Sequence, residues 1–485
     1  MFRVAPLVAA LLLASTLSAA PLAEQPDVAS RLALYSLWVE DQRAWLHQPG
    51  VAIGIVWGEE LVWARGFGVA DLESGRPVTP ETVFRLGSVS KTFTATALMQ
   101  LIEAGRARLD DPLTRHLPGL TWGSRFEGAN LTLWHLLTHT SGLPREAAFP
   151  YWTDRHFPTT EELHRGLAEQ ALLFEPGVDY QYSNLGLALL GEVVAALSGQ
   201  SYEEAVRSRI LAPLGMSSTW VELPPQGTLL ATGYLIRRPD GTQPVAPETD
   251  ARGLTPAANL SSNVMDLARY LGAHLGAGPA ERQILKPATR REMQRVQWLS
   301  PNWTSGRGLG FSVWRQGERT LVGHGGWVAG HRSQIAFDPK TRVGVIVLTN
   351  SDQGGPGDYV RRAFEVVAPA IEKATAPPTP PAPAFDAALY AGSYHNPWGE
   401  VTEVLVLDGR LVLFDRSQPP ADDPLASLIR LVPEGGHVFR LEGTERRLSF
   451  ELRQDGRVGR LKMDENYLFP ADCGEIGEDL RCTGR

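Results

Sequence analysis

The sequence has only two cysteines, no excess of basic residues and, after residue 20, no apolar run of the roughly 18 residues that cross a membrane. Two cysteines exclude a multi-disulfide scaffold and a four-cysteine zinc site. With 46 Lys and Arg against 54 Asp and Glu, the net charge of −8 argues against a nucleic-acid partner. We expect no transmembrane segment once the leader described below is removed. The remaining composition, 43% hydrophobic and 21% charged over 485 residues, indicates a globular protein with more than one domain.

Residues 1–20 have the pattern of a secretory signal peptide. A positive start at Arg3 precedes an apolar run over residues 4–13, and mostly small residues follow to residue 20. We therefore expect export to the periplasm or the cell exterior, with cleavage near residue 20. A hydrophobic N-terminal helix of the fold is the alternative. In an exported chain we also expect Cys473 and Cys482 to be bridged, and two free thiols are the alternative.

A proline-rich spacer over residues 374–384 divides the chain, because five of its eleven residues are proline. Before it, residues 24–373 show strand patterns at 51–57, 61–70, 319–323, 331–337 and 343–349. Helical patterns lie at 89–104, 185–197, 266–277 and 359–373, with Ser261 and Ser262 as candidate N-caps of the third. Strand pairs at both ends of a helical middle predict an α+β fold, in which an antiparallel sheet carries helices on its faces.

The segment after the spacer, residues 385–485, has a different pattern. Short alternating runs are separated by turn signals at Asp408-Gly409, Gly435-Gly436, Glu442-Gly443 and Asp455-Gly456. This spacing indicates about seven or eight strands and no helix. We therefore predict a second, all-β domain in the form of a small antiparallel barrel.

The first candidate chemical motif is Ser88-Val89-Ser90-Lys91, where a strand meets the start of a predicted helix. One helical turn places Ser88 and Lys91 on the same face. A serine at a helix N-terminus lies where backbone N–H groups favour an oxyanion, and a partly buried lysine beside it helps to remove its proton. By itself the motif also fits a capping serine next to a solvated lysine.

A second candidate segment, Tyr182-Ser183-Asn184, closes a turn-rich loop before a predicted helix. The phenol of Tyr182 is a candidate general base if a nearby cation lowers its pKa. Asn184 has the donors and the acceptor to position both Lys91 and a substrate carbonyl. Alone, the segment also fits a packed tyrosine at a helix entrance.

The third candidate segment, His324-Gly325-Gly326-Trp327, follows a strand pattern. Glycines on a strand edge let a substrate backbone come close, and backbone N–H groups there can complete an oxyanion hole. Alone, the segment also fits a glycine-rich hairpin turn.

Taken in this order, the three motifs resemble the signature of the serine β-lactamase and penicillin-binding-protein superfamily. The chain is similar to its class C-like branch, which includes class C β-lactamases, D-alanyl-D-alanine carboxypeptidases, D-aminopeptidases and serine esterases. Segments 136–143, 213–216 and 345–350 match as well, so the resemblance covers residues from about 30 to 370. The C-terminal domain resembles the lipocalin-like appendage of some hydrolases in this branch. Covering the cleft, mediating oligomers and stabilising the chain are all open as its role, and the oligomeric state is open too.

The resemblance implies a role for each motif residue and implies no cofactor. Ser88 is the acylated nucleophile, Lys91 tunes Ser88 and Tyr182, and Tyr182 takes the serine proton and returns it to the leaving group. Asn184 matches the amide of the second motif, and His324 and Gly326 match the ends of the third. The N–H groups of Ser88 and Trp327 would form the oxyanion hole.

One departure from the family pattern bears on the substrate. β-Lactamases and carboxypeptidases of this type usually carry lysine where this chain has His324, and histidine is mostly neutral near pH 7. The sequence therefore favours an exported serine hydrolase acting on ester or peptide-type carbonyls of a small-molecule or peptide substrate. A true β-lactamase or carboxypeptidase, with Arg332 as a substitute cation, is the alternative. An alternative of another class is a non-catalytic module that binds cell-wall peptide or penicillin.

Other chemistries fit the sequence less well. No serine lies in G-x-S-x-G, so the nucleophile elbow of α/β-hydrolases is absent. His135 and His139 are four residues apart on a predicted helix, a spacing that zinc can use, but a third ligand is not evident. We expect no metal site, and we expect His139 to pack or hydrogen-bond within its Leu-Thr-His-Thr-Ser-Gly corner.

Overall fold

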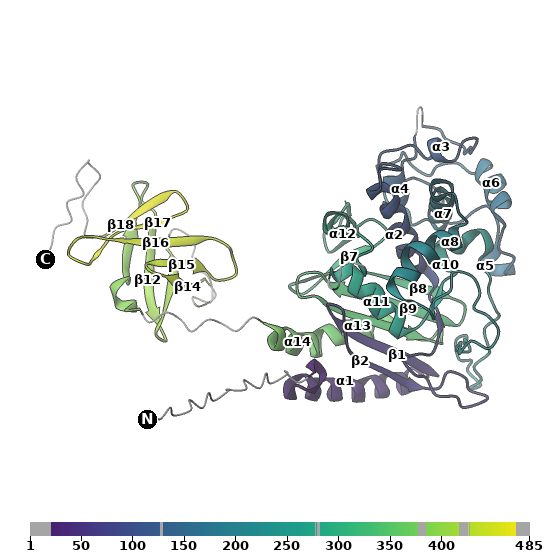
Figure 1. Cartoon of the computed structure of the whole chain (residues 1–485), viewed down its shortest axis with the longest axis horizontal. Helices are drawn as coiled ribbons and strands as arrows, with labels where there is room; N and C mark the ends of the chain where they lie inside the picture. Colours follow the sequence, from purple (N-terminus) through teal and green to yellow (C-terminus); the bar gives the residue numbers. More distant parts are fainter. Residues whose placement is uncertain are drawn as a thin grey trace, which may run out of the picture. The chain divides into compact units, whose positions relative to one another are not determined.

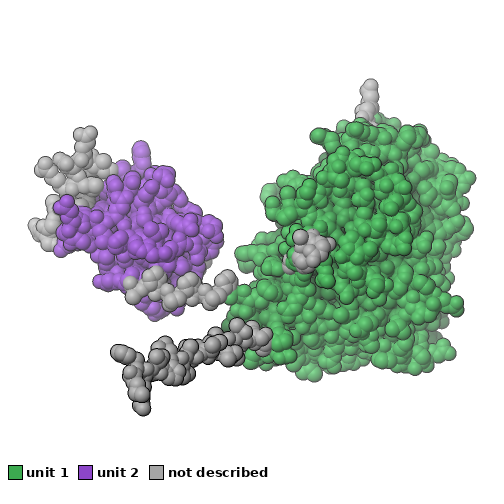
Figure 2. Space-filling model, viewed as in Figure 1, with its two compact units in different colours: residues 1–376 green, residues 377–485 purple. Residues whose placement is uncertain are grey.

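The computed structural model describes residues 21–471 except 127–129, 277, 279–281, 377–384, 417–424 and 426. The chain divides into two compact units, Met1–Ala376 and Pro377–Arg485, which are coloured separately in Figure 2. The leader, the proline-rich part of the spacer, Cys473 and Cys482 lie outside the described residues, and so do the predictions made for them.

An eight-stranded antiparallel sheet forms the centre of the first unit, with its strands in the order β2-β1-β10-β9-β8-β7-β6-β5. The N-terminal hairpin joins the C-terminal strands where β1 pairs with β10, which explains why strand patterns flank a helical middle. The strands are β1 Gly50–Trp57, β2 Glu60–Gly68, β5 Trp298–Leu299, β6 Ser305–Arg307, β7 Ser312–Gln316, β8 Arg319–Val328, β9 His331–Asp338 and β10 Val343–Thr349. A separate pair is made by β3 Phe84–Arg85 and β4 Ser261–Ser262.

Helices cover both faces of this sheet (Figure 1). Alternate residues of β1 face opposite cores: Val51 and Ile53 pack with α1 and α13, whereas Ala52 and Val56 pack with α11 and the helical region. The helices are α1 Pro26–Trp45, α2 Ser90–Glu103, α3 Leu113–His116, α4 Leu133–Thr138, α5 Tyr151–Asp154, α6 Thr160–Ala168, α7 Asn184–Ser198, α8 Tyr202–Val206, α9 Ala212–Leu214, α10 Thr255–Ala258, α11 Val264–Leu275, α12 Pro287–Gln294, α13 Pro356–Val366 and α14 Ala368–Thr375.

Two helix predictions need correction. The helix expected at 266–277 is α11, and its N-cap is Asn263, whose side chain accepts the N–H of Asp266. The expected caps, Ser261 and Ser262, form β4 instead. The single closing helix expected at 359–373 is two helices, α13 and α14, because Pro369 near the start of α14 lacks the N–H that would continue α13.

A membrane-spanning helix is not found as a single element among the described residues. One sharply bent pair, Asn184–Ser198 with Tyr202–Leu214, meets the criteria of length and apolar composition only when the two helices are taken together.

A closed antiparallel barrel of eight strands forms the second unit, which confirms the predicted all-β domain. Its interior is occupied by side chains: the ring of Tyr390 lies 5.1 Å from that of Phe439 and 4.8 Å from that of Phe450. The strands are β11 Gly392–His395, β12 Val401–Leu407, β13 Arg410–Asp415, β14 Ile429–Gly435, β15 Val438–Leu441, β16 Arg447–Leu452, β17 Val458–Met463 and β18 Asn466–Pro470.

Candidate active site

Ser88 and Lys91 lie where a short 3-10 turn, Gly87–Val89, runs into α2. Lys91 is fully buried; its Nζ lies 3.0 Å from Ser88 Oγ and donates to the carbonyl oxygen of Ala257 at 2.7 Å. Burial lowers the pKa of Lys91 well below its ordinary value, and the charge of Glu146 opposes this shift. The site therefore favours the neutral amine, whose lone pair can accept a proton from Ser88.

Tyr182 comes just before α7 and lies against both Ser88 and Lys91. Its ring stacks on His139 at 4.4 Å, and Lys91 Nζ and Arg145 Cζ each lie 5.0 Å from its centroid. Burial raises the pKa of Tyr182 to about 12, although a hydrogen bond with Ser88 and the charge of Arg145 act in the opposite direction. The expectation that nearby cations lower this pKa is therefore not met, because the loss of solvation is larger, and Tyr182 is a neutral phenol near neutral pH.

The two histidines at metal-ligand spacing serve separate local structures. His139 has a left-handed backbone (φ 60°) at the end of α4, and its Nδ1 accepts the N–H of Ser183 at 3.1 Å. It thus supports the Tyr182 loop, as expected for this corner. His135 belongs to the capping box of α4, where its Nδ1 accepts the N–H of Thr132. Within the described part of the chain, no three His, Cys, Asp or Glu residues are grouped to hold a metal ion.

The third motif lies inside a strand and not in a hairpin turn. His324, Gly326 and Trp327 are part of β8, which packs against the Ser88 turn. A Cβ added to Gly87 would lie only 2.5 Å from the backbone nitrogen of Trp327, so the backbones before Ser88 and at Trp327 touch. This contact brings the two N–H groups expected to form the oxyanion hole into one region.

His324 is neutral in this environment. It is 5% exposed, and its Nδ1 lies 2.6 Å from the carbonyl oxygen of Gly325. Burial lowers the pKa of His324 to about 3. His324 therefore provides no fixed cation for a substrate carboxylate, in line with the expectation from the sequence.

Among the described residues, Asn184 makes no hydrogen bond to Lys91, contrary to the expectation, and its buried Oδ1 has no hydrogen-bond partner. It is 4% exposed at the start of α7, and its side-chain nitrogen donates to Glu146 Oε1 at 2.6 Å. Glu146 also accepts the hydroxyl of Tyr151 and the guanidinium of Arg145. Asn184 is thus tied to a partly buried polar network beside the second motif. Glu146 is a member of this network that no sequence pattern indicated.

A cavity of about 550 Å³ opens over these motifs. It is lined by Ser88, Arg145, Tyr180, Tyr182, Arg307, His324, Gly325, Gly326, Trp327, Arg332, Ser333, Gln334, Gly355, Pro356 and Gly357. Three arginines on its wall give it a positive lining in a chain of net charge −8. Arg145 is paired with Glu146, whereas Arg307 donates to the neutral hydroxyls of Tyr180 and Ser312. The sequence indicated Arg332 as a candidate cation but gave no sign of Arg145 or Arg307.

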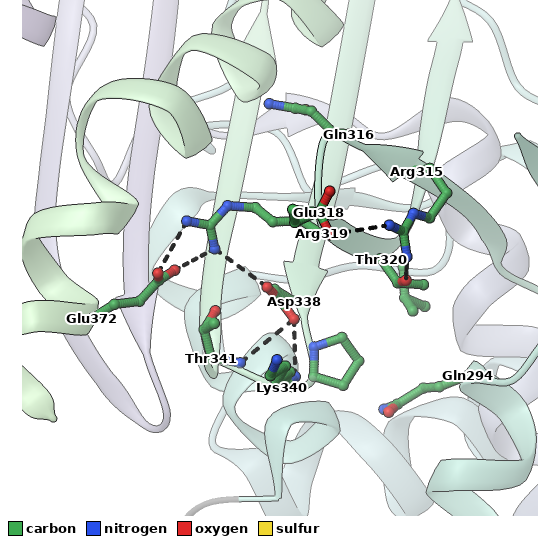
Figure 3. Close-up of a pocket in the computed structure, with 12 residues that line it drawn as sticks. Gln294, Arg315, Gln316, Glu318, Arg319, Thr320, Asp338, Lys340, Thr341 and Glu372 are labelled. Carbon is green, nitrogen blue, oxygen red and sulfur yellow. Dashed lines mark hydrogen bonds and ion pairs between the residues drawn. The ribbon is translucent and has the colours of Figure 1, made fainter. Parts of the chain in front are cut away.

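A larger cavity, of about 630 Å³, lies away from the motifs, between β7, β8, β9 and the helices α12 and α14. Figure 3 shows Arg319 of this cavity between two carboxylates, with Glu372 on one side and Asp338 on the other. Because its charged groups neutralise one another and it contains none of the motif residues, we place the candidate active site at the smaller cavity.

Comparison with known proteins shows the family of the chain. The beta-lactamase family model matches residues 38–369, so the chain belongs to the beta-lactamase family. Members of this family are typically serine hydrolases. Penicillin-binding protein 4 of Amycolatopsis lactamdurans is 30% identical over 374 residues, which cover 73% of this chain and 94% of that relative.

Two solved structures are similar to this chain in fold. The octameric penicillin-binding protein homologue from Pyrococcus abyssi matches with a TM-score of 0.63 at 26% sequence identity. The match covers 90% of this chain and 99% of that chain. A class C beta lactamase from Rhodobacter sphaeroides matches with a TM-score of 0.57 at 24% sequence identity. The match covers 70% of this chain and 98% of that chain. The resemblance seen in the sequence and the predicted α+β fold followed by a barrel are thereby confirmed.

Proposed function

We propose that this chain is an exported serine hydrolase that acts on ester or peptide-type carbonyls through an acyl-serine intermediate. One observation supports this proposal above all: the buried Nζ of Lys91 lies 3.0 Å from Ser88 Oγ at the start of α2, and Ser88 lines an open cavity. Burying an ionisable lysine side chain costs free energy. A non-catalytic binding module would have no function for such a lysine beside a serine hydroxyl. The export part of the proposal rests on the leader pattern of residues 1–20.

In the acylation step, neutral Lys91 accepts the Ser88 proton while Ser88 Oγ forms a bond to the carbonyl carbon. The N–H groups of Ser88 and Trp327 donate to the oxyanion, and the dipole of α2 adds to its stabilisation. This assignment replaces Tyr182 as the first proton acceptor, because a phenol with a pKa of about 12 is already protonated near neutral pH.

Tyr182 acts as the proton donor when the oxyanion collapses. Its hydroxyl gives a proton to the departing alcohol or amine and regains one from the Lys91 ammonium, so Lys91 is neutral again and Ser88 carries the acyl group. A water molecule then attacks the acyl carbon with the same groups working in the reverse direction. The sequence of steps releases the carboxylic acid and restores the Ser88 hydroxyl.

The arginines favour a second candidate within the same mechanism, a β-lactamase or carboxypeptidase type of substrate that carries a carboxylate. Arg307 and Arg332 line the cavity, and the partners of Arg307 are neutral hydroxyls. Such a guanidinium is suited to a carboxylate, which it can bind through two parallel hydrogen bonds. The neutrality of His324 therefore does not by itself exclude an anionic substrate.

A substrate panel tests the proposal. The wild type and Ser88→Ala would be assayed side by side with nitrocefin, p-nitrophenyl esters of several chain lengths and D-amino-acid amides. We expect turnover in at least one class and its loss in Ser88→Ala. Residual turnover in Ser88→Ala at the wild-type rate would overturn the assignment of the nucleophile. The class with the highest kcat/KM decides between the two candidates.

A further inference from the structure

The indole of Trp327 is partly uncovered inside the cavity of the candidate active site. It is 42% exposed and belongs to the residue whose backbone N–H we assign to the oxyanion hole. A ligand in this cavity would bury apolar area of the ring, which favours binding. Trp45 and Trp303 are exposed too, but neither lines this cavity.

The ring of Trp327 is also held in one orientation. Its Nε1 donates to Asp352 Oδ1 at 2.6 Å, and the same oxygen accepts the N–H of Gly330 at 3.1 Å. Asp352 is itself buried, and it follows β10, so it connects that strand to the β8–β9 turn. From another side the ring of Trp152, on α5, lies 5.4 Å away. A ring held in this way is pre-organised and loses little conformational freedom when a ligand packs on it.

We infer that Trp327, oriented by Asp352, forms an aromatic subsite for a flat apolar group of the substrate next to the reacting carbonyl. Because Asp352 already accepts the indole N–H, the ring offers a ligand its π surface and no hydrogen bond. The subsite therefore prefers an aromatic group to a small or polar one. Asp352 is a positioning residue that acts through Trp327. This inference rests on the proposed function, since it assumes that the carbonyl reacts at Ser88.

The test compares matched substrates in matched variants. The first pair, p-nitrophenyl phenylacetate and p-nitrophenyl acetate, differs in the acyl group. The second pair, benzyl acetate and ethyl acetate, differs in the leaving group, and its hydrolysis is measured by the release of acid. The readout is the ratio of kcat/KM within each pair. We expect Trp327→Leu to lower the ratio of at least one pair by about 10-fold, the loss of one aromatic contact. Trp45→Leu, which removes an exposed tryptophan on α1, is the control and leaves both ratios unchanged.

Asp352 is tested through its dependence on Trp327. Asp352→Ala lowers the same ratio when Trp327 is present and has no further effect on it in the Trp327→Leu background. Asp352→Asn restores part of the ratio, because its amide oxygen still accepts the indole N–H. The subsite would be overturned if Trp327→Leu left the kcat/KM ratio unchanged in both substrate pairs. It would also be overturned if Asp352→Ala changed the ratio equally in the wild type and in the Trp327→Leu background. Failure of the proposed function is distinct from this: either the wild type would hydrolyse none of the four esters, or Ser88→Ala would hydrolyse them at the wild-type rate.

Discussion

Gly326 and Leu86 are in such close contact that a Cβ on Gly326 would lie 1.9 Å from the carbonyl oxygen of Leu86. The Ser333 hydroxyl donates to that same oxygen at 2.6 Å, so β8 and β9 are both joined to the residue two positions before Ser88. The third motif and the turn that carries the nucleophile are therefore in direct backbone contact, which the Ser333 hydroxyl reinforces.

Gly326→Ala should disable the enzyme without unfolding it. The new methyl group would push β8 away from the Ser88 turn and displace the Trp327 N–H from the oxyanion. Loss of one oxyanion donor costs about 100- to 1000-fold in kcat. The measurement is kcat on the best panel substrate together with the melting temperature.

Gly325→Ala is the matched control for this substitution. A Cβ there would lie 3.2 Å from the side-chain oxygen of Gln334, a flexible group that can move aside. We expect its kcat to stay within a few-fold of the wild type. Equal losses in the two variants would contradict the backbone-contact account.

The pH profile of kcat/KM should have an acidic limb that belongs to Lys91. The pKa of Lys91 is lowered by burial, and below that pKa the ammonium has no lone pair for the Ser88 proton. Activity is therefore present above the folded-state pKa of Lys91 and is lost as the pH falls through it. Because the pKa of Tyr182 is about 12, no second limb is expected at moderately alkaline pH.

His324→Gln separates this assignment from a histidine limb. Since burial lowers the pKa of His324 to about 3, the residue does not titrate in the range of the assay. The acidic limb should persist in the variant. Its disappearance in His324→Gln would mean that the histidine and not Lys91 controls the profile.

Arg307→Gln should discriminate between anionic and neutral substrates. A charge-assisted hydrogen bond to a carboxylate is worth about 1.5–3 kcal/mol, which is about 10- to 150-fold in kcat/KM. We expect that loss for nitrocefin or another carboxylate-bearing substrate and a much smaller one for p-nitrophenyl butyrate. Arg315→Gln, in the separate cavity of Figure 3, is the control. Parallel losses on both substrates would argue that Arg307 only supports Tyr180.

Acid should destabilise the first unit between about pH 6.5 and pH 3. Burial lowers the pKa values of His274, His324 and His331 to about 3, and that of His139 well below its ordinary value. These side chains stay neutral when folded but bind protons when unfolded, so stability is full above their unfolded pKa and falls with pH. Each histidine contributes about 1.4 kcal/mol per pH unit within this window.

Urea denaturation at several pH values measures this dependence. His274→Phe keeps a ring among Tyr270, Phe311 and Phe337 and removes one titrating group, so the slope of unfolding free energy against pH should decrease. His156→Asn, at an exposed position, is the control and should leave the slope unchanged. A slope that His274→Phe does not alter would contradict the assignment of a neutral buried histidine.

Local patterns in the sequence were sufficient to predict that Ser88 and Lys91 are in contact. Ser88 and Lys91 are one helical turn apart, so their contact follows from helix geometry. The strands of the sheet and the turns of the barrel also had clear signals, because one-sided burial and Gly-containing turns leave short-range patterns. The predicted caps Ser261 and Ser262 failed because a strand pairing with Phe84 and Arg85, distant in sequence, outweighed their local preference.

The electrostatics of the site could not be predicted in the same way. The pKa of Tyr182 depends on burial produced by segments far apart in the chain, and that burial outweighs the cations that the sequence pointed to. Arg145 and Arg307 reach the cavity from a loop and from the three-residue strand β6, neither of which carries a motif. The partnership of Asn184 with Glu146 likewise depends on tertiary contacts.

Covalent labelling of Ser88 tests the central claim most directly. The wild type, Ser88→Ala and Ser30→Ala, an exposed serine on α1, would be treated with a serine-reactive fluorophosphonate and examined by intact-mass and peptide mass spectrometry. Lys91→Met would be included to test activation by the buried amine. We predict one adduct per chain, located on Ser88, in the wild type and Ser30→Ala. It should be absent in Ser88→Ala and form much more slowly in Lys91→Met. An adduct of wild-type yield in Ser88→Ala would contradict the account.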